Sequence, residues 1–220
     1  MITSITTLGK YHLFKSGWTT RANRIKLYTD NGTLVDTKTV TFTYASNNLS
    51  LSASAVFDVG AGTQDVSYVS LIYNDGSSDV VLYNRSLGTL YDFPTAGTFT
   101  VNTWVFSISA PTSLFMDRQS LFTTGWEVID ALVFNKMDTP VSGTIFENQL
   151  TTNISTGELV CAVNPIVNIS AGNSGINTIR FGYLGNLENM IPYYSEALPS
   201  SYSFTNAGTL TVENLKFTLA

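Results

Sequence analysis

The sequence predicts an all-β fold made of two tandem, duplicated antiparallel β-sandwich domains of jelly-roll-like form. Three observations predict it: the chain repeats itself at a distance of about 108 to 111 residues, apolar and polar residues alternate with period two, and turn signals recur every ~8–12 residues. The sequence shows no clear apolar stripe with 3.6-residue spacing, so it does not predict long helices. A repeat of this length is a domain, because the unit of a solenoid spans only about 20–50 residues.

The repeat is clearest where each half begins and ends. Leu13-Phe-Lys-Ser-Gly-Trp18 matches Leu121-Phe-Thr-Thr-Gly-Trp126, and residues 91–106 match residues 202–217 without a gap. Residues 61–73 and 171–183 also match, so three similarities occur in the same order. This indicates a tandem duplication, in which each copy has an ordinary size for a domain with its own core.

We expect four segments along the chain. Residues 1–11 are polar, show no strand pairing of their own, and are interpreted as an N-terminal arm that orders on a neighbour. Residues 12–110 form the first β-sandwich domain and residues 121–220 the second. Residues 111–120 are interpreted as a short linker, with a turn of helix or an entry loop near its end.

Each half is expected to contain about seven or eight short strands. The last strand of each half follows an Ala-Gly-Thr turn, at Ala96 and at Ala207. Asn-Gly supplies the positive φ of a type I′ hairpin, and Asp-Gly is a similar turn signal. Two hairpins are predicted in the first half: residues 25–28 and 34–42 around Asp30-Asn-Gly32, and residues 69–73 and 80–83 around Asp75-Gly76.

Composition excludes several classes of protein. Charged residues make up 12% of the chain, about half the usual share, and the formal net charge of −5 disfavours nucleic-acid binding. Cys161 is the single cysteine, so no disulfide forms within the chain, which fits assembly in a reducing cytoplasm. The N-terminal residues do not resemble a secretory signal, and no apolar run is long enough to span a membrane, so we expect no membrane partner.

Nucleophilic catalysis of the Ser-His-Asp or Cys-His type needs a histidine, and the chain has only His12. The matching position of the second half is Ser120, so the histidine does not recur. We expect His12 to be half-buried or exposed without a catalytic role, and Cys161 to be a small core residue of a strand. One Cys and one His cannot form a zinc site.

Calcium and glycoside hydrolysis are the remaining chemical alternatives. The turns Asp30-Asn-Gly-Thr33 and 75–79 offer oxygen ligands for calcium, although hairpin geometry alone also requires these residues. Glycoside hydrolysis needs two carboxylates across a cleft. The acidic residues considered for this role are isolated and do not recur between the halves: Asp58, Asp65, Glu147, Glu158, Glu188 and Glu196. We therefore expect no enzyme, and assign no catalytic, cofactor-binding or metal-binding residue.

Trp18 and Trp126 each follow a glycine in the same context. They could form a platform on which a sugar stacks, or they could pack in the core or at a strand edge. Core packing is the preferred interpretation, and exposure of the rings distinguishes the two.

Residues 55–73, a Gly-containing hairpin and residues 93–101 together resemble a module common in structural proteins of tailed bacteriophages. In those proteins an Ala-Gly-Thr turn leads into a strand, and a closing strand with the pattern Gly-Thr-Tyr/Phe-Thr-Val ends the domain. The second half differs more, with residues 168–174 at the first turn. The resemblance implies a component of the virion and names no catalytic residue.

We therefore expect a non-enzymatic virion protein, of the capsid decoration or head-fibre type, that binds other capsid or tail subunits through edge strands and low-charge faces. A tail, neck or baseplate component is the first alternative, and a module binding host glycan or a receptor is the second. Homo-oligomerisation is expected, because closed symmetric assemblies are the rule for such interfaces.

Overall fold

A computed structural model describes residues 4–108, 113–126, 131–136, 139–141, 146–147, 150–161, 164–186, 189–213, 215–217 and 219. Strands in antiparallel sheets dominate the described residues, and two short helices accompany them, so the predicted all-β class is confirmed. Neither of these two helices is long and apolar enough to cross a membrane. The division into two sandwich domains with the boundaries given above stays a prediction.

Ten strands and one helix lie in residues 4–108: β1 (Ser4–Ile5), α1 (Thr7–Ser16), β2 (Arg24–Thr29), β3 (Leu34–Thr39), β4 (Phe42–Ala45), β5 (Asn48–Leu51), β6 (Ala55–Val59), β7 (Thr63–Asn74), β8 (Asp79–Phe93), β9 (Gly97–Val101) and β10 (Val105–Phe106). From residue 113 onward, the described residues form β11 (Ser113–Met116), α2 (Arg118–Thr123), β12 (Ala131–Lys136), β13 (Thr139–Pro140), β14 (Phe146–Glu147), β15 (Leu150–Asn153), β16 (Glu158–Cys161), β17 (Ile166–Ile169), β18 (Asn173–Asn186), β19 (Asn189–Phe204), β20 (Gly208–Thr211) and β21 (Lys216–Phe217).

The second half repeats the strand order of the first. The first half has a five-stranded sheet β1-β8-β7-β2-β3, a three-stranded sheet β10-β5-β4 and a two-stranded sheet β6-β9. The second half has β11-β19-β18-β12-β13 with β14 beside β12, then β15-β16-β21 and β17-β20. Each strand of the first half thus has a counterpart with equivalent neighbours, and β14 is an additional strand of the second half. The central strands are longer than the sequence predicts, with 12 residues in β7 and 15 in β8.

The aromatic packing repeats as well. Tyr83 and Phe106 meet edge to face with ring centroids 5.0 Å apart, and their counterparts Tyr194 and Phe217 meet in the same way at 5.1 Å. These contacts join the central sheet of each half to the last strand of that half, β10 or β21. Edge-to-face pairs of this kind add about 0.5–1.5 kcal/mol beyond the burial of area.

Helix α1 begins inside the predicted N-terminal arm. Thr6 caps it, since its side chain accepts a hydrogen bond from the backbone N–H of Gly9, and Gly17 ends it with a φ of 70°. β1 pairs with β8, so the described part of residues 1–11 belongs to the first half and is not a separate arm. Residues 1–3 lie outside the described residues.

The predicted linker also contains structured elements. Residues 113–116 form β11, which pairs with β19, and α2 starts at Arg118 behind the cap residue Asp117. The expected turn of helix is therefore present and extends to Thr123. These elements are the counterparts of β1 and α1 in the first half.

Both predicted hairpins are present, but the turn of the first hairpin is not of the predicted type. β2 pairs with β3 and β7 pairs with β8, as expected. The Asp30-Asn-Gly32 loop is not a type I′ turn: Gly32 has a positive φ of 84°, Asn31 does not, and Thr29 N–H bonds to Thr33 O across a longer loop. The pair of positive φ angles that defines a type I′ turn occurs at Ser46 and Asn47, with 50° and 65°.

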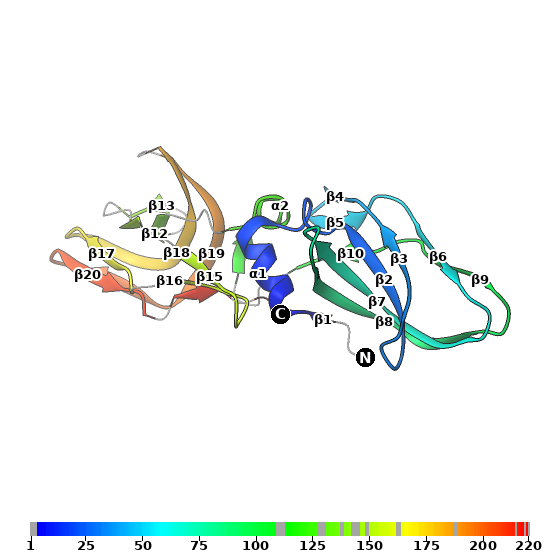
Figure 1. Cartoon of the computed structure of the whole chain (residues 1–220). Helices are drawn as coiled ribbons and strands as arrows, with labels where there is room; N and C mark the ends of the chain where they lie inside the picture. The colour runs from blue at the N-terminus through cyan, green and yellow to red at the C-terminus, as the bar shows by residue number, and fades with distance from the viewer. Residues whose placement is uncertain are drawn as a thin grey trace.

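The helices lie between the two halves, and the two-stranded sheets lie at opposite ends of the molecule (Figure 1). β6 and β9 mark one end, and β17 and β20 mark the other. α1 contacts α2 and the strands β15 and β16 of the second half, while α2 contacts β4 of the first half.

Candidate functional site

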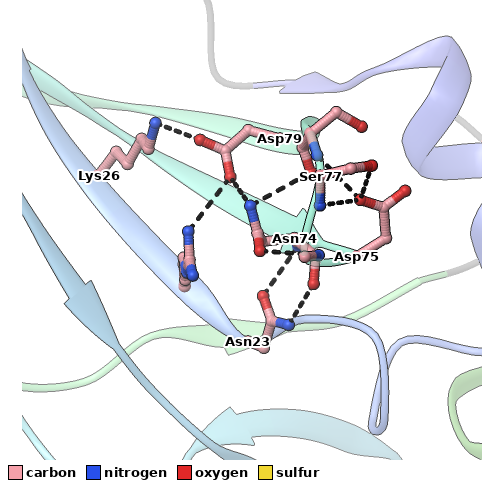
Figure 2. A network of polar contacts seen from close by, with 9 residues as sticks. Asn23, Lys26, Asn74, Asp75, Ser77 and Asp79 are labelled. Carbon is pink, nitrogen blue, oxygen red and sulfur yellow. Dashed lines mark hydrogen bonds and ion pairs between the residues drawn. The ribbon is translucent and has the colours of Figure 1, made fainter.

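The turn between β7 and β8, one of the two calcium candidates, is held by its own hydrogen bonds (Figure 2). Oδ1 of Asp75 accepts from the backbone N–H groups of Ser77 and Ser78, each at 2.9 Å, and from the Ser77 hydroxyl at 2.8 Å. These bonds, that of the Ser77 N–H first, lower the pKa of Asp75 to about 2. This carboxylate oxygen therefore serves the turn itself.

Asp79, at the other side of the turn, is neutralised by cations of β2. Its carboxylate pairs with Lys26, lies 3.6 Å from Arg24 and accepts from the Asn74 side chain at 2.7 Å. The hydrogen bond from Lys26 is the main cause of its lowered pKa. Asn23 and Asn74 bond to each other through side chain and backbone, so the network ties the turn to the start of β2 (Figure 2).

The second calcium candidate, Asp30-Asn-Gly-Thr33, is also closed by internal bonds. Oδ1 of Asn31 accepts from the Thr29 hydroxyl at 2.6 Å and from the Thr33 N–H at 3.1 Å. No three His, Cys, Asp or Glu side chains of the described residues gather closely enough to hold a metal ion. The geometry of both turns is that of hairpin closure.

His12 lies on α1 in an aromatic and cationic cluster, and its side chain is half-buried as predicted. The imidazole meets Tyr11 and Tyr73 edge to face, at 5.1 and 5.3 Å between ring centroids. Burial lowers the pKa of His12, and the charges of Arg21 and Lys15 lower it further. Arg21 stacks on Tyr73 and bonds to its hydroxyl at 2.6 Å. The imidazole of His12 thus lies among aromatic rings and cations, and the Ser16 hydroxyl donates at 3.3 Å to the backbone carbonyl of His12.

Trp18 and Trp126 are each 1% exposed, so they cannot form a platform on which a sugar stacks. Their indole N–H groups donate to equivalent backbone carbonyls, Trp18 to Gly9 at 3.0 Å and Trp126 to Asp117 at 3.3 Å. The core interpretation of both residues is confirmed. Cys161 is a partly buried strand residue of β16, paired with Leu150 and packed against the core.

The acidic side chains considered for glycoside hydrolysis that the structure describes have different partners. Asp58 bonds to Lys38 at 2.8 Å, Glu158 to Lys216 at 3.1 Å, and Glu196 accepts from Tyr194 at 3.1 Å. The backbone of Asp65 donates to Asp92 at 2.9 Å. The side chain of Glu147 and all of Glu188 lie outside the described residues.

Two cavities open on the first half. A cavity of about 490 Å³ is lined by Trp18, Tyr83 and Phe106, with Lys10 among its polar residues. A smaller cavity of about 190 Å³ lies between residues 85–87 of β8 and the segment 99–103. Neither contains a pair of acid and base groups at hydrogen-bonding distance.

Equivalent hydrogen bonds occur twice where the two halves meet. We call this region the joining face, and it consists of α1, α2 and the Gly17-Trp18 and Gly125-Trp126 segments. The backbone N–H of Trp18 donates to Phe122 O at 2.7 Å, and that of Trp126 donates to Phe14 O at 2.6 Å. Phe14 and Trp126 lie 6.0 Å apart between ring centroids, and Trp18 and Phe122 lie 6.3 Å apart. Each contact therefore has a reciprocal partner, which is the pattern of a twofold-related interface.

The repeated Gly-Trp pair was the sequence signal for this face. At Gly17 a Cβ atom would meet the carbonyl of Phe122, and at Gly125 it would meet the carbonyl of Phe14. Both glycines also have positive φ angles, of 70° and 79°. Sequence reasoning found the match between these segments but did not predict that they face each other.

The two-stranded sheets at the ends expose equivalent apolar residues. Val56 of β6 is 47% exposed, and Ile166, at the same position of β17, is 55% exposed. Tyr91 of β8 and its counterpart Tyr202 of β19 are also exposed. The described residues give β9 and β20 a single strand neighbour each, β6 and β17, so each leaves one edge open.

No protein-family model matches the chain, and the searches of curated proteins and of solved structures also found no match.

Proposed function

We propose that the protein is a non-enzymatic structural component of a tailed bacteriophage particle, of the capsid decoration or head-fibre type, that bridges other virion subunits. The observation that carries this proposal is the pair of equivalent open sheets, β6-β9 and β17-β20, at opposite ends of one chain (Figure 1). A molecule with this arrangement can bind two neighbouring subunits through the same kind of contact.

The open edges of β9 and β20 suit pairing with a strand of a partner, because main-chain hydrogen bonds then provide the affinity. The exposed Val56 and Ile166 supply apolar contact beside these edges. The resemblance of residues 55–73 and 93–101 to modules of phage structural proteins supports the same proposal. Asp75 is engaged in its own turn, and Asp58 and Glu158 form ion pairs with lysines.

Quantitative mass spectrometry and cryo-electron microscopy of purified particles test this function. Hundreds of copies on the capsid lattice fit a decoration or head-fibre protein, whereas a few to a few tens of copies place it in the tail, neck or baseplate. Absence of the chain from purified particles contradicts the proposal.

The docking surface is tested by Val56→Asp and Ile166→Asp, produced in host cells that assemble particles lacking the natural chain. We expect each variant to fold and to be incorporated at a lower copy number. Ile154→Asp is the matched control, because Ile154 is 57% exposed and lies outside the end sheets, between β15 and β16. Equal incorporation of all three variants contradicts docking through the end sheets.

A further inference from the structure

The joining face has the composition and symmetry of a homodimer interface. Phe14 and Phe122 are fully buried, and Trp18 and Trp126 are 1% exposed, so an aromatic cluster closes the contact between the halves. Aromatic and arginine residues are enriched in the buried centres of protein interfaces. In a homodimer residue i of one subunit contacts residue j of the other and the reverse also holds, as it does here between the halves.

The long-range polar contacts follow the same rule. Lys10 of α1 donates to the carbonyl of Leu219 at the end of the second half. Arg118 of α2 is the counterpart of Lys10, and its Nε donates at 2.6 Å to the carbonyl of Ile108 at the end of the first half. Each half thus presents the same set of groups: a cationic side chain, a glycine with positive φ, a tryptophan, and a backbone carbonyl two residues after the phenylalanine of β10 or β21.

One asymmetry specifies which half fits which. α1 has 10 residues and α2 has 6, so α1 is longer at its first turn. That turn lies over Gly157, where a Cβ would be 2.5 Å from the carbonyl oxygen of Thr7 and 2.9 Å from Cβ of Lys10. The corresponding turn of the first half is the tighter Ser46-Asn47 turn. The first half is therefore shaped for a second half, and a copy of itself is a poorer partner.

From these contacts we propose that the joining face is a self-sufficient protein–protein interface, and that a second copy of this chain can supply either half. The first half of one molecule then pairs with the second half of another through the contacts seen here within one chain. In the intact chain the covalent connection keeps the partner half at a high effective concentration, which favours pairing within the molecule. This inference is independent of the proposed function, because it concerns only the chain and its copies.

The test uses the full chain with a protease recognition sequence inserted between Pro111 and Thr112. The protein is folded, checked by circular dichroism, cut, and analysed by size exclusion and native mass spectrometry. We expect the cut protein to remain a single particle containing both halves. When isotope-labelled and unlabelled cut proteins are mixed, dissociated in urea and returned to native conditions, we expect hybrid particles in the statistical proportion.

Two results would overturn the inference: separation of the halves on cutting, or recovery of native particles without hybrids. Gly125→Ala provides the interface variant, because its Cβ would meet the carbonyl of Phe14. On dilution, the two halves of the cut Gly125→Ala protein should dissociate at a protein concentration at least tenfold higher than the two halves of the cut parent. Gly172→Ala is the matched control, since it has a φ of 82° and no atom within 4 Å of its Cβ position. If Gly125→Ala does not fold, Arg118→Ala takes its place, and an unchanged separation of the cut halves then counts against the inference.

Discussion

Lys10 and Arg118 occupy equivalent positions in the two halves, and each donates a hydrogen bond to a backbone carbonyl at the end of the opposite half. The acceptors, Leu219 and Ile108, are themselves equivalent. Leu219 lies two residues after Phe217 of β21, and Ile108 lies two residues after Phe106 of β10. Hydrogen bonds with a charged donor are stronger than neutral ones. The pair therefore holds the closing segment of each half against the helix of the other.

Arg118→Ala should lower the free energy of unfolding by about 1–2 kcal/mol, because it removes a charged donor from a partly buried carbonyl. Arg118→Lys should retain most of the stability, since lysine performs this role at position 10. Urea denaturation followed by circular dichroism measures both variants. Equal losses for alanine and lysine at this position would show that the bond to Ile108 is not the source of the effect.

Gly17→Ala and Gly125→Ala should each destabilise the protein by more than the ~1–3 kcal/mol that a strained backbone conformation costs. Strain at positive φ adds to a clash with a carbonyl oxygen of the other half. Gly62→Ala and Gly172→Ala are the matched controls, because their φ angles are 78° and 82° and their Cβ positions are free of neighbours. Thermal unfolding compares the four variants. Equal shifts in Tm would indicate strain alone, without the contact between halves.

The hairpins could be predicted because their signals are local. Alternation before and after Asp75-Gly76 specifies both strands and the turn, and the structure has them there. Helix α1 was missed because its buried face consists of Gly9, Leu13 and Phe14. A glycine adds nothing to an apolar stripe, and it is required here because the helix backbone approaches the carbonyl of Leu82. Only tertiary packing reveals that reason.

The joining face was not predictable for a related reason. The sequence shows that Gly17-Trp18 and Gly125-Trp126 match, but a match between repeats does not tell whether they touch. The alternatives left open for the tryptophans depended on exposure, which the alternation of neighbouring residues did not determine. The burial of both rings decided in favour of the core.

The tryptophan fluorescence of the native protein should be typical of buried indoles. The chain has three tryptophans, and Trp18, Trp104 and Trp126 are 1%, 2% and 1% exposed. We expect weak quenching by acrylamide, a red shift only on unfolding, and no change on addition of host-surface glycans. Strong quenching in the folded protein would mean that an indole is accessible and would revive the glycan-binding alternative.

His12 should make stability fall in mildly acidic solution. Its pKa in the folded protein lies below the ordinary value of 6.5, because burial and then Arg21 and Lys15 disfavour the imidazolium. The folded state thus binds this proton more weakly than the unfolded state, so the contribution is present above pH ~6.5 and is lost as the pH falls through the folded pKa. The rings of Tyr11 and Tyr73 also face the imidazole.

Comparison of Tm for the parent and His12→Gln between about pH 7.5 and pH 5 measures this effect. We expect the parent to lose more stability than the variant over that range. An NMR titration of the imidazole provides a direct control of the pKa. Parallel Tm curves, or an imidazole that titrates above 6.5, would rule out the proposed cause.

The carboxylate of Asp75 should stabilise the folded protein except in strong acid. Its pKa is lowered to about 2 by the bonds from Ser77 and Ser78, whereas an unfolded aspartate titrates near 3.9. Its contribution is therefore complete above pH ~4 and disappears as the pH falls through about 2.

Asp75→Ala should unfold at a lower temperature than the parent at neutral pH, and the difference should shrink as the pH falls from about 4 to about 2. Asp75→Asn, which keeps an acceptor oxygen but does not titrate, should lose less at neutral pH and should approach the parent as acid is added. A constant gap between the parent and Asp75→Ala from pH ~5 to ~2 would show that packing of the turn, and not the carboxylate charge, makes the difference.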